Sequence, residues 1–386
     1  MVKEIKFDIM KIQQSEWTAA NGWSETTETS DLEANFVLVF GGIDVIGIPD
    51  RFLEIKNKYP FANIVLNSTA GEIIDDKVGD GSIICNAIQY EKTELDFVEI
   101  SVSDYEDSFA CAKEICKQLS HEGLKHVLII SDGSMVNGDE LVKGMNSCLK
   151  NDVLVTGGLA ADAGRFSKTL VGLNDVPSEG KIVAIGHYGE NIEINHGSKG
   201  GWDEFGPMRS ITKSEGNVLF ELDGQNALDV YKKYLGPKAS ELPGAALLFP
   251  LSIYFEDGSK LVRTILSIDE EKGSMTFAGD IPSSMNCRFM MANFDRLIDG
   301  AASAAENSSF NKELKGEALI LMISCVGRKL ALGQRVEEEV ESVKEVLGDE
   351  YTYTGFYSNG EISPVIDSVG CSLHNQTMTI TTYNEN

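Results

Sequence analysis

The sequence predicts a mixed α/β (α+β) fold of two related domains, each a mixed sheet flanked by helices. Short apolar runs that end in glycine alternate with amphipathic helical segments, which is typical of strands and helices that share a core. One order of elements occurs twice: helix, strand, break at serine, helix, strand, break at threonine and glycine. The serine and glycine of each copy are Ser131 and Gly157, then Ser324 and Gly355. An internal duplication is the simplest explanation.

The first part of the chain reads as a polar lead-in followed by a sheet. Residues 1–7 alternate charged and apolar side chains like a strand, whereas residues 11–34 are polar and predict a loop with a short helix. The next predicted elements are strands at 36–40, 63–66, 82–89 and 95–102, the last two partly antiparallel to each other, and a helix at 51–58.

The repeated unit gives the most regular periodicity. Its first helix places Phe109, Ala112 and Ile115 on one face. The predicted first copy has helices near 109–119 and 139–149 and strands at 126–130 and 153–156. The predicted second copy has helices at 294–306 and 334–347 and strands at 318–323 and 351–354.

Between the copies, the Gly- and Pro-rich segment 197–207 predicts a structured loop that crosses between domains. A helix at 227–235 would open the second domain. We therefore divide the chain into a lead-in (1–35), an N-terminal domain (36–220) and a C-terminal domain (221–386).

Composition excludes several classes of partner. The formal net charge is -27, so the chain lacks the basic surface that binds nucleic acid, and it would be repelled by an anionic membrane. No apolar stretch has the length of a membrane span. The seven cysteines contain no CxxC pair, which predicts reduced thiols in a cytoplasmic protein.

No catalytic motif stands out. The sequence contains no GxSxG, P-loop, HExxH, GxGxxG or paired Cys/His zinc pattern. We therefore predict that the protein is not an enzyme. The alternative is a hydrolase or transferase with Cys325 or Ser68 as nucleophile and Arg328 as anchor for an anionic group.

The strand ends carry the candidate binding residues. The runs 324–333 and 355–361 both leave an apolar strand for small, polar or basic residues, so we expect them to face one shared cavity. The candidates are Ser68, Thr69, Glu72, Gly157, Gly158, Asp162, Cys325, Arg328, Lys329, Gly355, Tyr357 and His374.

Most of these candidates have a structural alternative. Ser68 and Thr69 are also good helix caps, and Gly157 and Gly158 also suit a turn. Arg328 and Lys329 would bind an anion at a cavity mouth or form a solvated pair at a helix start. Cys325 would be a reactive thiol beside these cations or a buried, inert one. His374 also suits a structural role on an alternating strand.

Five segments resemble the FIST family of intracellular sensory proteins: 67–73 (NSTAGEI), 157–162 (GGLAAD), 221–231 (ELDGQNALDVY), 324–333 (SCVGRKLALG), and Gly355 through 373–377 (LHNQT). They span about residues 36 to 381 in the family's order. Leu66-Asn67 stand where the family commonly has Gly-Cys, and Ala161 stands where a glycine is expected.

The resemblance implies an N-terminal and a C-terminal FIST domain that form one sensory module. Family members resemble receptors for small ligands, with amino acids proposed, and often accompany histidine kinases, cyclic-dinucleotide enzymes or chemoreceptors. Stand-alone members of this size include nitric-oxide-sensing haem proteins that control a histidine kinase.

These observations predict a non-enzymatic sensor that binds a small ligand between its two domains and changes their closure. It would signal through a separately encoded histidine kinase or cyclic-dinucleotide enzyme. Haem b with nitric oxide is the leading ligand hypothesis, with His196, beside a Gly-rich loop, as the candidate iron ligand. A free amino acid or another metabolite, without haem, is the alternative.

Overall fold

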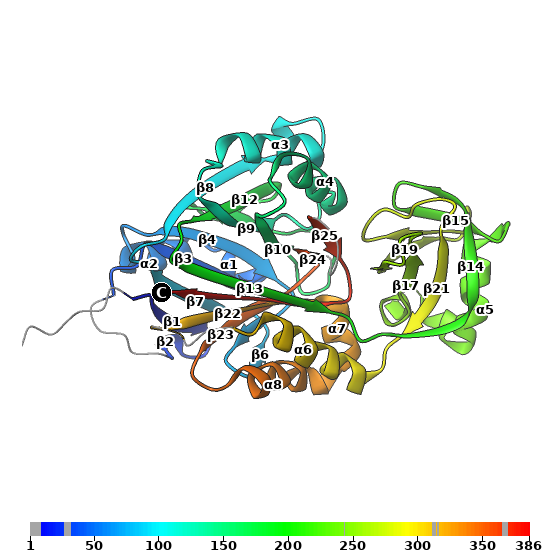
Figure 1. The fold of residues 1–386 in the computed structure, drawn as a ribbon. Coiled ribbons are helices and arrows are strands. Elements are labelled where there is room, and N and C mark those ends of the chain that lie inside the picture. Colours follow the sequence, from blue (N-terminus) through cyan, green and yellow to red (C-terminus); the bar gives the residue numbers. More distant parts are fainter. Residues whose placement is uncertain (1–8, 27–31, 243, 311–313, 315, 365–369) are drawn as a thin grey trace, which may run out of the picture.

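A computed structural model describes residues 9–26, 32–242, 244–310, 314, 316–364 and 370–386. Figure 1 shows a large body and a smaller lobe beside it, formed by residues 203–291. The body contains three six-stranded sheets. Mixed sheets flanked by helices confirm the predicted α/β class. The strand predicted at residues 1–7 lies outside the described residues.

The three sheets of the body are built from three units with the same strand path. The strands of the first unit are β1 (Lys11–Thr18), β3 (Phe36–Gly42), β4 (Asn63–Thr69) and β7 (Ile83–Gln89); those of the second are β8 (Glu94–Ser101), β9 (Leu124–Ser131), β10 (Leu154–Leu159) and β12 (Lys181–Tyr188); those of the third are β13 (Ile192–Lys199), β22 (Ala318–Cys325), β23 (Thr352–Ser358) and β26 (Met378–Glu385). In each unit the second and third strands are parallel and the other neighbours are antiparallel. The duplication predicted from the sequence is therefore a triplication.

Each unit gives one strand to another unit. β5 (Glu72–Ile74) follows β4 but pairs with β23 of the third unit. β24 (Gly360–Pro364) follows β23 but pairs with β10 of the second unit, and β11 (Val171–Leu173) follows β10 but pairs with β4 of the first. The first unit thus gives a strand to the third, the third gives one to the second, and the second gives one to the first. Backbone hydrogen bonds therefore join all three units. The outer strands β2 (Gly22–Glu25), β6 (Lys77–Gly79) and β25 (Cys371–His374) extend the sheets.

The exchange crosses the predicted domain boundary near residue 220. Strands from the first half of the chain lie in the third sheet, and strands from the second half lie in the second sheet. The boundary itself stays a prediction, but the hydrogen-bonded sheets do not follow it.

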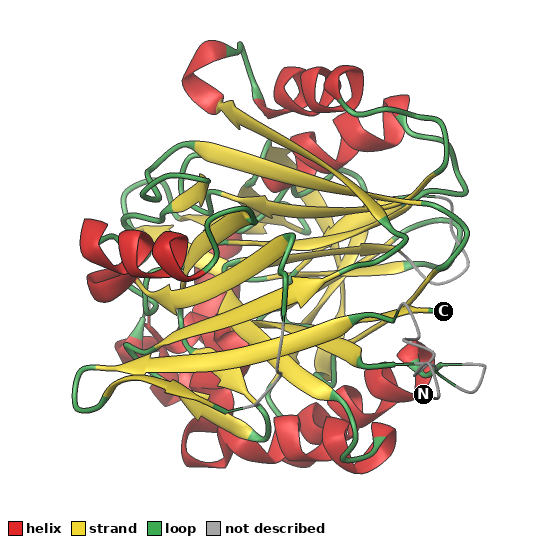
Figure 2. Cartoon of the chain, turned by 90° about the vertical axis from the view of Figure 1, so that its left-hand side faces the viewer, coloured by secondary structure: helices red, strands yellow, loops and turns green. Residues whose placement is uncertain are grey.

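Helices cover the outer faces of the sheets, as Figure 2 shows. They are α1 (Ile43–Ile46), α2 (Pro49–Lys58), α3 (Ser108–Gln118), α4 (Gly138–Cys148), α6 (Phe294–Ser308), α7 (Val326–Leu332) and α8 (Val336–Leu347), with short 3-10 turns at Val102–Asp104 and Gly333–Arg335. The inner faces of all three sheets meet in one core, to which Phe40, Ile130 and Phe356 each contribute from a different unit. None of the helices in the described ranges is long and apolar enough to cross a membrane.

The lobe is inserted into the third unit between β13 and α6. Its elements are β14 (Asp203–Glu215), β15 (Val218–Leu222), β16 (Gln225–Asn226), α5 (Ala227–Leu235), β17 (Leu251–Tyr254), β18 (Lys260–Arg263), β19 (Ile265–Asp269), β20 (Ser274–Phe277) and β21 (Asn286–Met291), with 3-10 turns at Gly236–Glu241 and Gly244–Leu248. The two edge strands of its sheet, β18 and β19, are separated only by Thr264, so the sheet curls until its edges meet. The lobe has its own apolar core, and the predicted helix at 227–235 is confirmed as α5.

Three local predictions are wrong. The segment 197–207 is not a loop throughout, because residues 197–199 belong to β13 and residues 203–207 belong to β14. Residues 11–34 contain strands β1 and β2 rather than a loop, because the buried Gln14 amide donates to Asn86 Oδ1 and to the Tyr353 carbonyl, both at 2.9 Å. The strands predicted at 82–89 and 95–102 exist as β7 and β8, but they lie in different sheets.

The expectation of reduced thiols is also wrong at one pair, because Cys116 and Cys148 form a disulfide. These residues lie near the ends of α3 and α4, which pack closely at Gly144. A Cβ there would lie 2.5 Å from the Ala112 methyl carbon. Cys85, Cys111, Cys287, Cys325 and Cys371 are free.

A buried histidine pair on β9 and β12 faces the core that the three units share, beside Phe36, Tyr90 and Tyr383. The Nδ1 atoms of His126 and His187 are 3.3 Å apart, and His126 Nε2 is 2.8 Å from Thr156 Oγ1. Burial lowers the pKa of His126 well below its usual value and that of His187 to about 3. The unfolded chain therefore binds more protons than the folded one below about pH 6.5.

We expect His187→Leu to reduce the acid sensitivity of the fold. The stability that neutral His187 contributes is present above pH 6.5 and falls as pH drops toward 3, by about 1.4 kcal/mol per pH unit. Urea unfolding between pH 6.5 and pH 4 measures this effect. As pH falls, the free energy of unfolding should decrease less steeply in the variant than in wild type. Exposed His121 provides the control variant His121→Leu. Parallel pH profiles of wild type and His187→Leu would contradict this account.

Candidate functional site

The three units meet at the carboxyl ends of their parallel strands. Three backbone hydrogen bonds close a ring there: Ala70 N to Tyr357 O (2.9 Å), Asn359 N to Leu159 O (3.1 Å) and Ala161 N to Ser68 O (3.0 Å). Each donor lies two residues after the acceptor of its own unit, so the ring repeats the threefold pattern of the strands. We call this set of six residues the strand-end ring.

Two of the units place a buried carboxyl beside the ring at equivalent positions. Thr69 Oγ1 donates to Glu72, and Ser358 Oγ donates to Glu361 at 2.7 Å. Burial raises the pKa of Glu72 to about 7 and that of Glu361 to about 8, against the opposing effect of these hydrogen bonds. The second unit has Ala163 at the equivalent position, so the threefold pattern is not carried into the side chains.

The ring brings together several of the predicted site residues. Ser68, Thr69, Glu72, Asp162 and Tyr357 all lie at it or directly beside it, and all are buried. Ser68 Oγ accepts a hydrogen bond from Leu170 N at 2.9 Å, and Tyr357 Oη donates to Glu339 Oε1 at 2.6 Å. The strand ends converge, but these side chains bond to one another and to the backbone.

The predicted glycines lie within the strands and let the backbones approach closely. A Cβ on Gly157 or on Gly355 would lie 1.9 Å from the carbonyl oxygen of the adjacent parallel strand, at Ile129 and Met322 respectively. A Cβ on Gly158 would lie 2.7 Å from the Ile323 side chain. Glycine is therefore required for packing at these positions, whatever contacts a ligand makes.

Arg328 lies inside the body rather than at a cavity mouth. Its guanidinium pairs with Glu339 at 2.7 Å and donates to the carbonyls of Leu297 (2.8 Å) and Gly200 (3.0 Å), with 0% of the side chain exposed. The helix that follows Cys325 begins at once, so Arg328 turns inward instead of pointing to solvent.

The remaining basic, thiol and imidazole candidates also have structural partners. Lys329 Nζ donates to the Ala70 carbonyl at 2.8 Å and pairs with Asp80. Cys325 is buried, and burial raises the pKa of its thiol. His374 Nε2 is 3.1 Å from the Ser363 carbonyl, and burial lowers its pKa to about 4.

His196 lies on β13 opposite Thr381, and burial lowers its pKa. Ile194 lies two residues before His196, on the same face of β13, and is paired with Tyr383 of the shared core. The His196 side chain therefore also faces this core. No group of three or more His, Cys, Asp or Glu side chains within the described ranges is placed to hold a metal ion.

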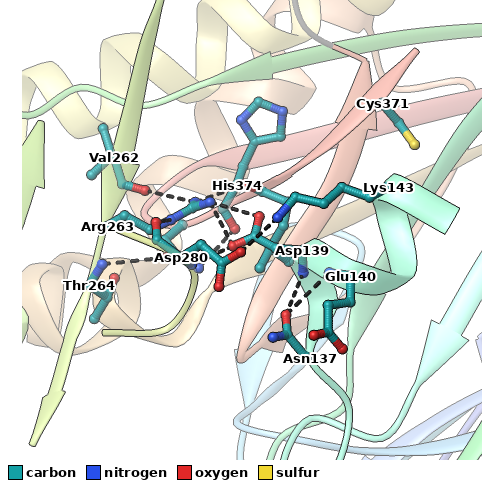
Figure 3. Close-up of polar contacts among 12 residues, drawn as sticks. Asn137, Asp139, Glu140, Lys143, Val262, Arg263, Thr264, Asp280, Cys371 and His374 are labelled. Atoms are coloured by element: carbon teal, nitrogen blue, oxygen red, sulfur yellow. Dashed lines mark hydrogen bonds and ion pairs between the residues drawn. The ribbon is translucent and has the colours of Figure 1, made fainter. Parts of the chain in front are cut away.

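Lobe and body meet at a buried ion pair and at an apolar cluster, which joins Leu248, Val262 and Met290 of the lobe to Leu297, Ala331 and Leu332 of the body. Arg263 of β18 donates through Nη2 to both carboxylate oxygens of Asp139 at 2.7 and 2.9 Å, and through Nη1 to the Leu373 carbonyl at 3.0 Å (Figure 3). Only 1% of Arg263 and 8% of Asp139 are exposed. Asp280 N also donates to Asp139, at 2.6 Å. We call Arg263 and Asp139 the clamp.

Local structure fixes both partners of the clamp. Asp139 lies in the first turn of α4, where the helix dipole favours a carboxylate, and Asn137 caps this helix. Arg263 is at the end of β18, where the chain turns into β19. Burial lowers the pKa of Arg263, while the Asp139 charge opposes that shift.

Two cavities lie along the cleft between lobe and body. The outer cavity has a volume of about 470 Å³. Its lining includes the clamp, the ion pair of Lys143 with Asp280 (2.7 Å), and the apolar side chains of Val142, Phe255, Leu261, Ile281, Pro282 and Leu373. The second cavity, of about 300 Å³, touches Leu159 and Asn359 of the strand-end ring. We call it the ring cavity.

Sequence reasoning missed the clamp residues. Asp139 and Arg263 are 124 positions apart, so no local motif joins them. One signal was present: Arg263 is an isolated charge in the strand-like run Leu261-Val262-Arg263-Thr264-Ile265, which is unusual unless the charge is paired.

Comparison with known proteins identifies two domains. A model of the FIST N domain matches residues 35–225, and a model of the FIST C domain matches residues 227–364. No curated protein matches the chain at a significant level.

We expect Arg328→Ala to destabilise the fold by about 3–5 kcal/mol, because Glu339 would keep a buried charge without its partner. Chemical unfolding measures this loss. Arg335, which pairs with Glu338 on the surface, provides the control: Arg335→Ala should have a small effect. Wild-type stability of Arg328→Ala would show that its buried pair is not structural.

Proposed function

Because the chain contains a FIST N domain followed by a FIST C domain, we propose that it is a sensory protein without catalytic activity of its own. It binds a small ligand in the cleft between body and lobe and signals through a separate partner protein. FIST domains are predicted sensory and signalling domains, which supports the general class. We choose the cleft as the binding site because the clamp joins its two walls.

The clamp is the charged part of the contact that positions the lobe, and an apolar cluster of lobe and body residues is the other part. Arg263 and Asp139 attract each other only when lobe and body are closed, and separation would leave each charge desolvated or require water to enter. Gln376 of the body donates to Thr264 Oγ1 at 2.8 Å and adds a second contact at the same seam. A ligand that touches both walls would favour the closed arrangement by its differential contacts.

The charges along the outer cavity favour a ligand without net charge. Asp139 is balanced by Arg263, and Asp280 is balanced by Lys143. A free amino acid, as a zwitterion, or a neutral metabolite would leave this balance intact. An ion would bring a charge that finds no unpaired counter-charge among these four residues.

The burial of the proposed nucleophiles supports a non-catalytic function. Ser68 is fully buried and its hydroxyl accepts from a backbone N–H. The raised pKa of the Cys325 thiol opposes formation of the thiolate that attack requires. A histidine kinase or a cyclic-dinucleotide enzyme remains the proposed kind of partner.

Haem sensing of nitric oxide is the second proposal, but the geometry does not favour it. His196 faces the shared core and is not among the described residues that line either cleft cavity. Titration of the purified protein with haem tests the proposal directly. A Soret shift that His196→Ala removes would support it, and no shift would reject it.

We expect the double variant Arg263→Met, Asp139→Asn to loosen the lobe, because it removes both charges of the clamp without leaving one unpaired. Spin labels at the exposed positions 150 and 272 report the distance between body and lobe. The variant should broaden a narrow wild-type distance distribution. A ligand found by thermal-shift screening of amino acids and neutral metabolites should narrow the distribution again.

The matched control is Lys232→Met, Glu270→Gln, which removes an ion pair within the lobe. It should leave the distance distribution unchanged. Equal distributions in wild type and clamp variant would contradict the proposed role of the cleft.

A further inference from the structure

The ring cavity is lined by no ionisable side chain among the described residues. Its lining comprises Gly133, Ser134, Met135, Val136, Asn137, Gly138, Leu159, Phe166, Asn217, Leu266, Phe277, Ala278, Gly279 and Asn359. The clamp charges lie behind Gly279, where a Cβ would be 2.5 Å from Asp139 Oδ2. Because these charges are paired with each other, the cavity offers no counter-charge to an ion.

One polar atom of this lining lacks a partner. Asn359 Oδ1 is inaccessible to solvent and has no hydrogen-bond partner among the described residues. The backbone of Asn359 is fixed by its N–H bond to the Leu159 carbonyl in the strand-end ring. Buried polar atoms in native proteins are nearly always satisfied. A half-turn of the amide exchanges Oδ1 and Nδ2 and turns the oxygen toward the cavity that Asn359 lines. A ligand that donates an N–H to the turned oxygen would satisfy it.

The walls of the ring cavity are apolar and come from both body and lobe. Met135 and Phe166 of the body and Leu266 of the lobe remain 56%, 39% and 41% exposed. Phe277 of the lobe and Leu159 of the ring complete the apolar lining. Large exposed apolar side chains around one cavity indicate a surface that a ligand covers.

Phe166 is held in place at a conformational cost. Its φ is 52°, in the left-handed region that bulky residues rarely adopt. The buried Asp162 carboxylate imposes this conformation by accepting from Phe166 N and Ser167 N at 2.8 Å and from Lys168 N at 3.0 Å. Backbone strain of this kind is concentrated at binding sites.

We propose that the ring cavity binds a neutral, planar heterocycle that carries an N–H beside a carbonyl. The Asn359 amide pairs with this group, and the aromatic and aliphatic walls pack on the ring faces. A volume of about 300 Å³ is at the lower end of the range of small-molecule pockets, which suits one or two rings. The inference rests on the proposed function, because it names the class of ligand that closes the cleft.

The test uses uracil, hydantoin and xanthine as probes, with binding measured by calorimetry on the full chain. We expect at least one probe to bind. Its N-methylated derivative, which lacks the donor (1,3-dimethyluracil for uracil), should bind about tenfold more weakly or worse. Orotate, which adds a carboxylate to uracil, should bind more weakly than uracil.

Two variants locate the binding. Asn359→Ala removes the amide but keeps the ring hydrogen bond of its backbone, and should weaken probe binding about tenfold. Leu266→Glu places a charge on the lobe wall at a partly exposed position and should abolish binding. Asn195→Ala, which removes an amide outside the cavity, is the control and should bind like wild type. Circular dichroism confirms that each variant is folded.

Three results would overturn the inference: no binding of any probe at millimolar concentration, equal binding of the methylated derivative, or wild-type binding by folded Asn359→Ala. Closure of the lobe by an amino acid with no heterocycle binding would overturn this inference and leave the proposed function standing. If no ligand changes the distance between lobe and body, the proposed function itself is contradicted.

Discussion

The circular exchange of β5, β11 and β24 is the constraint on which the rest of the structure depends. Each of these strands completes a sheet of another unit, so no unit can bury its sheet edge alone. The three inner faces then share one apolar core, and the carboxyl ends of the parallel strands are brought to one point. The backbone hydrogen bonds of the strand-end ring follow from this arrangement. Separate side-chain hydrogen bonds, from Leu170 N to Ser68 Oγ and from Ser358 Oγ to Glu361, satisfy the polar residues that are buried there.

The lobe adds to this rigid body an element that is held by specific contacts. It enters the third unit at Gly200 to Trp202, where Gly201 has a φ of 141° and a Cβ would lie 2.2 Å from the Arg296 carbonyl. From there the lobe returns over the second unit, and Arg263 reaches Asp139 at the start of α4. Both cleft cavities thus have one wall fixed by strand exchange and one wall carried by the lobe.

Much of the fold was predictable from sequence, because helical periodicity and apolar runs ending in glycine report local structure. The helices and the parallel strands of the second and third units were found within a few residues, whereas β12 and β13 were not predicted. The first unit was not recognised as a third copy, because its strand ends in Gly41-Gly42 rather than serine and no helix precedes it in residues 9–26 and 32–35. Strand partners are set by tertiary contacts, so the exchange left no sequence signal. The candidate site was only partly predicted. The strand ends converge, but the inward direction of the Arg328 side chain depends on its pairing with Glu339. The clamp joins residues 124 positions apart, so no local pattern indicated it.

Hydrogen exchange measured by mass spectrometry tests the central claim that a body locked by strand exchange carries a separately opening lobe. Peptides that contain Ala70, Ala161 and Asn359 should exchange together, at the free energy of global unfolding. Peptides of the lobe should exchange through an opening reaction with a lower free energy than global unfolding. Different protection of the three ring segments, or exchange of lobe and body at one common free energy, would contradict the account.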